Sequence, residues 1–174
     1  MNSIDLGGSG IVAAEVSRED AERAWEKGAA GGHTVARLSG DLSGLKNPER
    51  EIKRTIPFSI LPPHLFSHET IWHDVDSKRW SVADHVTLGE SRAVVRVSEL
   101  IHLVAGAHGK TYSCLEDNQP TSGAMNKGRS PTVSLNFLCR KKAGRLLAAN
   151  ARLALLWVES RLMPADELSR VSNE

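Results

Sequence analysis

Three acidic residues, Glu90, Asp117 and Asp166, stand at the ends of predicted secondary-structure elements, where carboxylates can do chemistry. Glu90 precedes Val94 by four positions and Val97 by seven, so it falls on the apolar stripe of its predicted helix. Asp117 follows a predicted strand, and ligand sites in open α/β sheets gather at the carboxyl ends of strands. Clustered carboxylates repel one another unless they share a cation, and Mg²⁺ is the usual one. We therefore expect these acids to form a site for a hard divalent cation.

The elements that must position these acids follow from the periodicity of the chain after residue 88. Apolar residues recur at helical spacing in two segments, β-forming residues dominate a third, and a fourth is a nearly unbroken apolar run. The sequence thus predicts a helix over 90–105, a strand over 111–115, an amphipathic helix over 131–150 and a strand over 152–158. This order indicates an α/β layer with parallel pairing, and a short helix is expected near Pro164.

The end of the predicted strand over 111–115 runs into a turn over 117–120, which contains Asn118 and Pro120. Because side chains alternate along a strand, Glu116 and Asp117 are expected on opposite faces. Of the two, only Asp117 is therefore expected at the site.

Residues 1–55 are rich in glycine, and we interpret them as a flexible linker with one short helix over 21–27, started by a cap at Ser17. Prolines then hold the backbone extended near residue 60, and apolar residues become frequent. We therefore expect a folded domain over 56–170 and a tail over 171–174.

The composition of the 174 residues is that of an ordinary globular protein, with a formal net charge of +1. No window approaches the roughly 18 apolar residues that span a bilayer, and no signal-peptide pattern opens the chain, so a soluble intracellular protein is expected. Cys114 and Cys139 form no metal-binding pattern and are expected to be small buried residues, so zinc is not expected.

Charge is unevenly distributed along the chain. Residues 1–84 hold 10 Lys/Arg against 13 Asp/Glu, whereas residues 85–170 hold 12 against 7. This excess suits a phosphate-backbone partner, although a solvated basic surface explains it equally well. The basic group that raises this question consists of Lys127, Arg129, Arg140, Lys141, Lys142 and Arg145.

The order of several short motifs resembles the ribonuclease H-like domain that follows reverse transcriptase in retroelements, especially DIRS-like and related protist forms. The resemblance covers about residues 60–170. Its motifs are Leu88-Gly89-Glu90-Ser91-Arg92-Ala93, Leu115-Glu116-Asp117-Asn118, Asn126-Lys127-Gly128-Arg129-Ser130 and Trp157-Val158 followed by Pro164-Ala165-Asp166-Glu167-Leu168-Ser169-Arg170. It implies a ribonuclease H-like mixed sheet flanked by helices, in which Mg²⁺ or Mn²⁺ ions held by four acids cleave the RNA strand of an RNA–DNA hybrid.

Carried over by position, this resemblance makes Glu90 the helix acid, Asp117 the strand-end acid and Asp166 the last acid. It also implies nucleic-acid contacts from Asn118, Lys127, Arg129 and Arg170, and the adjoining reverse transcriptase domain as a further partner. The first acid should lie on an opening strand about forty residues before Glu90, where the antiparallel strands are instead truncated or degenerate. Three nearby acids are too close to Glu90 to replace it: Asp74, Asp76 and Asp84.

The resemblance therefore predicts a hybrid-binding domain with a degenerate two-metal site. An active ribonuclease H with an unidentified fourth acid and a non-functional retroelement fragment remain alternatives. Each acid also has an ordinary structural explanation. Glu90 could favour a helix start through the helix dipole, Asp117 could sit in a plain turn, and Asp166 could occupy a first helical turn.

Overall fold

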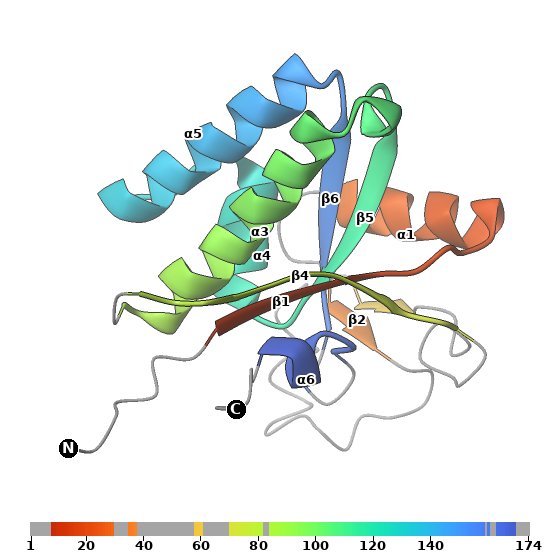
Figure 1. Ribbon diagram of the computed structural model, residues 1–174, viewed down its shortest axis with the longest axis horizontal. Helices are drawn as coiled ribbons and strands as arrows, with labels where there is room; N and C mark the ends of the chain where they lie inside the picture. Colours follow the sequence, from red (N-terminus) through yellow and green to blue (C-terminus); the bar gives the residue numbers. More distant parts are fainter. Residues whose placement is uncertain are drawn as a thin grey trace.

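The computed structural model describes residues 8–29, 35–37, 58–60, 70–81, 84–158, 160 and 163–169. Figure 1 shows the elements in chain order. They are β1 (Gly8–Ala13), α1 (Arg18–Ala29), β2 (Val35–Arg37), β3 (Phe58–Ile60), β4 (His73–Arg79), α3 (Val86–Leu103), the 3-10 turn η2 (Ala105–Ala107), β5 (Thr111–Glu116), α4 (Gln119–Lys127), α5 (Val133–Ala148), β6 (Arg152–Trp157) and α6 (Asp166–Ser169).

The strands of the described residues form two sheets, so the fold is mixed α/β. One sheet has the order β3-β2-β6-β5, and each of its neighbouring pairs is parallel. The other is the antiparallel pair of β1 and β4. Strands β5 and β6 pair along their whole lengths, from Thr111 opposite Arg152 to Glu116 opposite Trp157. The four predicted elements and the parallel pairing of their two strands are therefore confirmed, while helix α4, between β5 and α5, was not predicted.

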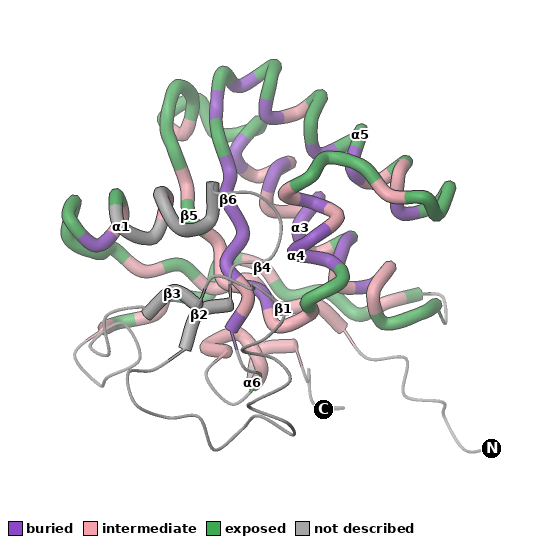
Figure 2. Tube along the Cα trace, turned by 180° about the vertical axis from the view of Figure 1, so that it is seen from behind, coloured by how far each residue is buried: buried purple, intermediate pink, exposed green. Residues whose placement is uncertain are grey.

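Helices cover both faces of the four-stranded sheet. Helices α3, α4 and α5 lie on one side, and α1 packs against β5 and β6 from the other (Figures 1 and 2). Four successive residues of β6, from Leu153 to Leu156, are consequently buried, as the apolar run predicted. Leu153 and Leu155 join the main apolar core with residues of α3 and α5, such as Val94 and Leu146.

The N-terminal segment differs from the predicted linker, because residues 8–29 form β1 and α1. A Cβ atom on Gly10 would lie 2.8 Å from the backbone nitrogen of Ser169, and one on Gly8 would lie 2.9 Å from the carbonyl oxygen of the same residue. The absence of a side chain at these glycines therefore allows α6 to cross β1 closely. The predicted helix is confirmed, with Ser17 capping it by accepting a 3.1 Å hydrogen bond from the backbone of Asp20.

The N-terminal half contributes an antiparallel pair of strands, β1 and β4, which the sequence pattern did not reveal. These strands were hard to recognise because β1 is glycine-rich and because the seven residues of β4 are mostly polar and exposed. The proposed domain boundary at residue 56 and the tail over 171–174 lie outside the described residues, and so they stay predictions.

Helix α3 begins four residues earlier than predicted, at Val86. Its cap is His85, whose Nδ1 accepts a 3.2 Å hydrogen bond from the backbone of Thr87. Histidine is not among the residues that usually mark an N-cap, so the sequence pattern did not reveal this start. Glu90 consequently lies in the second turn of α3, beyond the first turn in which the helix dipole favours acids.

Helix α4 occupies the place of the predicted turn. Asn118 caps it by accepting a 3.0 Å hydrogen bond from the backbone of Thr121, and Pro120 lies in its first turn, where no helical hydrogen bond is lost. The same Asn-x-Pro signal suits a turn, and the polar, glycine-containing sequence of α4 has little helical periodicity. Asn126 then fixes α4 to β6 through hydrogen bonds of 2.7 and 2.9 Å with both backbone polar groups of Leu155.

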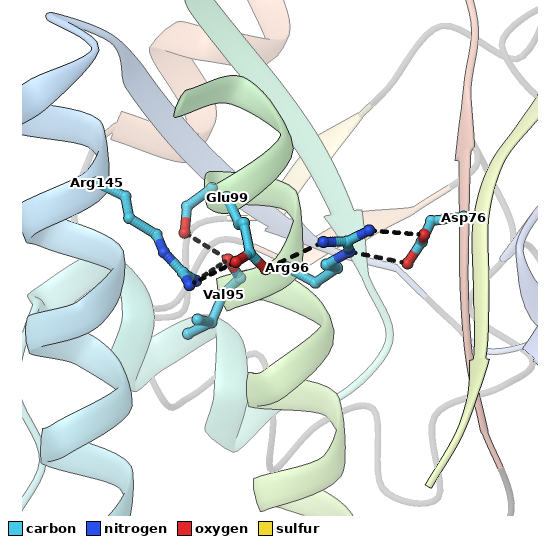
Figure 3. Close-up of polar contacts among 6 residues, drawn as sticks. Asp76, Val95, Arg96, Glu99 and Arg145 are labelled. Carbon is cyan, nitrogen blue, oxygen red and sulfur yellow. Dashed lines mark hydrogen bonds and ion pairs between the residues drawn. The ribbon is translucent and has the colours of Figure 1, made fainter. Parts of the chain in front are cut away.

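A chain of charged contacts connects β4, α3 and α5 (Figure 3). Arg96 donates two hydrogen bonds of 3.0 and 3.1 Å to Asp76, and it pairs with Glu99 at 3.1 Å. Arg145 of α5 reaches the other oxygen of Glu99 at 3.0 Å and the carbonyl oxygen of Val95 at 3.0 Å. Hydrogen bonding to Arg96 lowers the pKa of Asp76. The antiparallel pair is thus anchored to the helical layer.

Replacing Arg96 with methionine is expected to lower the free energy of unfolding by about 1 kcal/mol, because a two-point but partly exposed ion pair is lost. Urea denaturation at neutral pH measures this change. Arg92→Met is the matched control. Arg92 lies on the same helix, and it forms an exposed ion pair with Asp84, which precedes the helix. Equal effects of the two substitutions would contradict the anchoring role of Arg96.

In the described part of the chain, no helix combines the length and apolar character needed to cross a membrane.

Candidate metal centre

Three carboxylates meet at the carboxyl end of β5. One oxygen atom from each of Glu90, Glu116 and Asp117 lies within 4.8 Å of one oxygen of the other two. Glu90 comes from α3, whereas Glu116 ends β5 and Asp117 follows it directly. The structure therefore brings together two of the three predicted acids and adds a third, Glu116, that the sequence had placed on the opposite face.

Glu116 was missed because β5 ends at this residue and the chain bends at Asp117. The alternation of side chains therefore no longer applies to the pair. Glu116 is 5% exposed, and its Oε1 accepts a 3.1 Å hydrogen bond from the backbone of Asn118. A glutamate that ends a predicted strand, directly before a predicted site aspartate, was the signal that could have revealed it.

The backbone around Asp117 is held from a neighbouring strand. Trp157, the last residue of β6, donates a 2.6 Å hydrogen bond from Nε1 to the carbonyl oxygen of Asp117. This contact restrains the chain between β5 and α4. Trp157 itself is half-buried.

The first turns of α3 and α4 are fixed to each other, and this sets the position of Glu90 relative to Asp117. Thr121 donates a 3.2 Å hydrogen bond to the carbonyl oxygen of Thr87, and its hydroxyl lies 3.3 Å from that of Ser91. Ser91 and Thr121 are both fully buried. Rigid supports of this kind keep a binding site in one geometry.

Trp80 adds a further support where it approaches Gly89 of α3. A Cβ atom on Gly89 would lie 2.3 Å from the Trp80 ring, so only glycine admits this contact next to Glu90. The indole therefore packs directly on the helix backbone, which explains why a glycine precedes the site acid.

Burial and mutual repulsion raise the pKa values of two of the acids. The pKa of Glu90 rises to about 7, first because the side chain is removed from water and then because Asp117 is negative. Burial also raises the pKa of Glu116 well above its ordinary value, with Glu90 and Asp117 adding to the effect. A bound cation would remove the cost of charging this group of acids.

Asp166, the third acid predicted from the sequence, lies outside this group of carboxylates. It begins α6, which packs against β1 and β4, and Ser77 of β4 donates a 3.2 Å hydrogen bond to the carbonyl oxygen of Leu168. The expected convergence of all three acids is therefore found for Glu90 and Asp117, while a catalytic or metal-binding role for Asp166 stays a prediction.

The position expected for the first acid, about forty residues before Glu90, lies outside the described residues, and so it stays a prediction. The six residues of β1 contain no carboxylate. In β4, Asp76 is engaged by Arg96 and Asp74 is exposed. Neither belongs to the group formed by Glu90, Glu116 and Asp117.

The predicted nucleic-acid contacts divide into three kinds. Lys127 and Arg129 are exposed around the C-terminal end of α4, as a surface contact requires. Asn118 uses its side-chain oxygen to cap α4. Arg170 lies outside the described residues. Contact with nucleic acid stays a prediction for all four.

Two members of the predicted basic group, Lys142 and Arg145, do not contribute to an exposed basic surface. Lys142 is buried, and its ammonium donates a 3.0 Å hydrogen bond to the carbonyl oxygen of Met125. Arg145 is held by Glu99 and Val95. Arg140 and Lys141 are exposed, so the surface basicity of α5 is smaller than its sequence suggests.

Both cysteines lie within the protein rather than on its surface. Cys139 is 1% exposed, and Cys114 is half-buried. Burial raises the pKa of Cys114 to about 12 and also raises that of Cys139. Both thiols are therefore protonated and unreactive at neutral pH, in agreement with their expected role as small apolar residues.

The chain matches no protein-family model, no curated protein and no solved structure with which it was compared.

Proposed function

We propose that the chain is a ribonuclease H-like domain of retroelement type that binds RNA–DNA hybrids through a divalent cation. The observation that carries this proposal is the convergence of Glu90 and Asp117, which lie on different elements. The sequence motifs assign these same two residues as the helix acid and the strand-end acid. Agreement between a motif-based assignment and an independent spatial arrangement supports the family relationship.

The order of the elements also supports the proposal. An antiparallel pair of strands contacts α3, and β5, two helices and the parallel strand β6 follow along the chain. A short helix carrying Asp166 ends this series. In a ribonuclease H-like domain, the helix acid, the strand-end acid and the last acid follow one another along the chain in this same order of elements.

The three grouped carboxylates fit a hard cation. Carboxylate oxygens are the preferred protein ligands of Mg²⁺ and Mn²⁺. Burial of Glu116 and the raised pKa of Glu90, which is about 7, indicate negative charge that is costly without a cation. Glu90, Glu116 and Asp117 would hold the ion. When bound, such an ion orients a phosphate and lowers the pKa of attacking water.

Cleavage of the RNA strand is a second candidate function, and Glu116 is the observation that favours it. The family motifs require four acids, of which Glu90, Asp117 and Asp166 were assigned from the sequence. Glu116 adds a carboxylate at the group itself. It therefore offers an additional ligand beside Glu90 and Asp117, whereas β1 contains no carboxylate.

A labelled RNA–DNA hybrid, incubated with the purified chain in Mg²⁺ or Mn²⁺, tests both functions. We expect binding whose affinity falls with salt in the manner of several phosphate contacts, and that weakens when EDTA replaces the cation. Cleavage that is abolished by Asp117→Asn would establish the nuclease. Absence of hybrid binding in either cation would contradict the proposed function and leave a non-functional fragment.

The exposed cations near α4 provide a separate check on nucleic-acid binding. A double variant, Lys127→Ala with Arg129→Ala, is expected to weaken hybrid binding and to reduce the salt dependence by about two phosphate contacts. Lys110→Ala with Arg152→Ala is the matched control, because these residues lie at the opposite, amino ends of β5 and β6. The same loss from both pairs would contradict a local contact surface at α4.

A further inference from the structure

The outward face of α5 exposes three large apolar side chains in a helical stripe. Val133 is 85% exposed, Phe137 is 56% exposed and Leu147 is 83% exposed. Arg140 and Gly144 fall between them, so the five positions follow one another at intervals of four, three, four and three residues. This is the spacing of a seam along which one helix packs against another. We call these five residues the α5 seam.

The inward face of α5 is already occupied, so the α5 seam is an additional surface. Leu135, Cys139, Lys142 and Leu146 are buried, and α5 packs against α3. Figure 1 shows α5 at the edge of the helical layer, with α3 on its inner side. The seam therefore faces away from the core of the domain.

The shape of the α5 seam admits a close approach by another helix. A Cβ atom built on Gly144 would meet no other atom within 4 Å. A small residue inside a seam allows two helix backbones to come near each other, because no side chain separates them. The seam spans about 21 Å from Val133 to Leu147 at the rise of an α-helix, which corresponds to about four turns of a partner helix.

The charge of this face determines the chemistry of its partner. Helix α5 contains no acidic residue. Arg140 and Lys141 are exposed, and within the described part of the chain neither forms an ion pair. The Lys141 ammonium lies 4.9 Å from the centre of the Phe137 ring, so positive charge borders the apolar stripe directly. Carboxylates on the partner would complement both cations.

A second copy of this chain does not suit the seam. Arg140 is the central position, so pairing of two α5 helices about a two-fold axis would place Arg140 opposite Arg140 of the other copy. Nucleic acid also suits it less well, because the exposed Val133, Phe137 and Leu147 would meet a polar, charged backbone. Both features favour an apolar partner that carries negative charge.

We propose that the α5 seam is a docking surface for an acidic amphipathic helix of a partner protein. Apolar side chains of that helix would pack on Val133, Phe137 and Leu147, and its carboxylates would pair with Arg140 and Lys141. This interaction is independent of the cation site, because α5 contributes none of the grouped acids.

The test uses the full chain and two fluorescent synthetic helices of about four turns. Both have leucine at seam spacing; one carries glutamate at the positions that face Arg140 and Lys141, and the other carries lysine there. We expect the glutamate peptide to bind at least about tenfold more tightly by fluorescence anisotropy, since opposite charges complement the surface. The reversed variant, Arg140→Glu with Lys141→Glu, should exchange this preference.

Two further variants separate the seam from other exposed apolar residues. Phe137→Ser with Leu147→Ser is expected to weaken glutamate-peptide binding by at least about tenfold, because the apolar anchors are lost. Leu103→Ser, which alters a 67%-exposed residue outside α5, should leave binding unchanged. Circular dichroism checks that each variant remains folded.

Three outcomes would overturn the proposal. The first is equal binding of the two peptides, or binding that is unaffected by the Phe137 and Leu147 substitutions. The second is self-association of the chain that the same substitutions abolish, which would assign the seam to a second copy. The third is loss of hybrid binding in the Arg140 and Lys141 variant without any peptide preference, which would assign it to nucleic acid.

Discussion

Replacing Asp117 with asparagine is expected to weaken Mn²⁺ binding by at least about 100-fold, because the substitution removes a charged ligand from the group formed with Glu90 and Glu116. Glu116→Gln should weaken binding in the same direction, which would establish that the residue missed by the sequence takes part in the site. Isothermal titration calorimetry, or the electron paramagnetic resonance signal of free Mn²⁺, measures both affinities.

Asp74→Asn is the matched control for this prediction. Asp74 is an exposed acid on β4, and it lies outside the group of carboxylates. Its removal changes the net charge by the same amount as Asp117→Asn but should leave Mn²⁺ affinity unchanged. Equal losses from the two variants would mean that the ion responds only to general negative charge and would contradict a defined site.

The second large effect is a fall in stability of the cation-free protein as the pH rises from about 4.5 to about 8. The pKa of Glu90 is raised from 4.5 to about 7, so between these values the folded protein retains a proton that the unfolded chain has lost. The folded state then binds more protons, and its free energy of unfolding decreases with pH. After allowance for partial solvent screening, Glu90 should account for about 2 kcal/mol of this loss.

Glu90→Gln tests this account, because an uncharged amide cannot be ionised. Thermal unfolding in EDTA should show that the variant loses less stability than the original chain between pH 5 and pH 8. Mn²⁺ should restore stability to the original chain at pH 8, since the ion binds the deprotonated carboxylates. Identical pH dependence of the two proteins would contradict the burial and repulsion assigned to Glu90.

The secondary structure of the C-terminal region could be predicted because its patterns are local. Helices α3 and α5 and strands β5 and β6 were each anticipated from apolar periodicity or from a continuous apolar run. Helix α4 could not be anticipated, because its stability depends on tertiary contacts. These include the hydrogen bonds of Asn126 to β6 and the contacts of Thr121 with α3.

The N-terminal half was less predictable because its strands depend on partners that are distant in the sequence. Strand β1 pairs with β4, more than fifty residues later, and its glycines are needed for the approach of α6. No window of sequence around Gly8 or Gly10 contains this information. The same composition therefore suits a linker equally well.

The candidate site was predictable in part. Glu90 lies on a buried helical stripe and Asp117 lies at a strand end. These two positions were sufficient to predict that the residues lie close together. The inclusion of Glu116 depended on the bend of the backbone at Asp117, which strand alternation does not describe. The position of Asp166 depended on how α6 packs against β1 and β4.

A crystal of the chain grown or soaked in Mn²⁺ gives the most direct test of the cation site, because the anomalous scattering of the ion locates it without reference to activity. We predict an anomalous peak between the carboxylates of Glu90, Glu116 and Asp117, with oxygen ligands at about 2.0–2.3 Å. Absence of a peak between these three residues at saturating Mn²⁺, or a peak held by other side chains instead, would contradict the account.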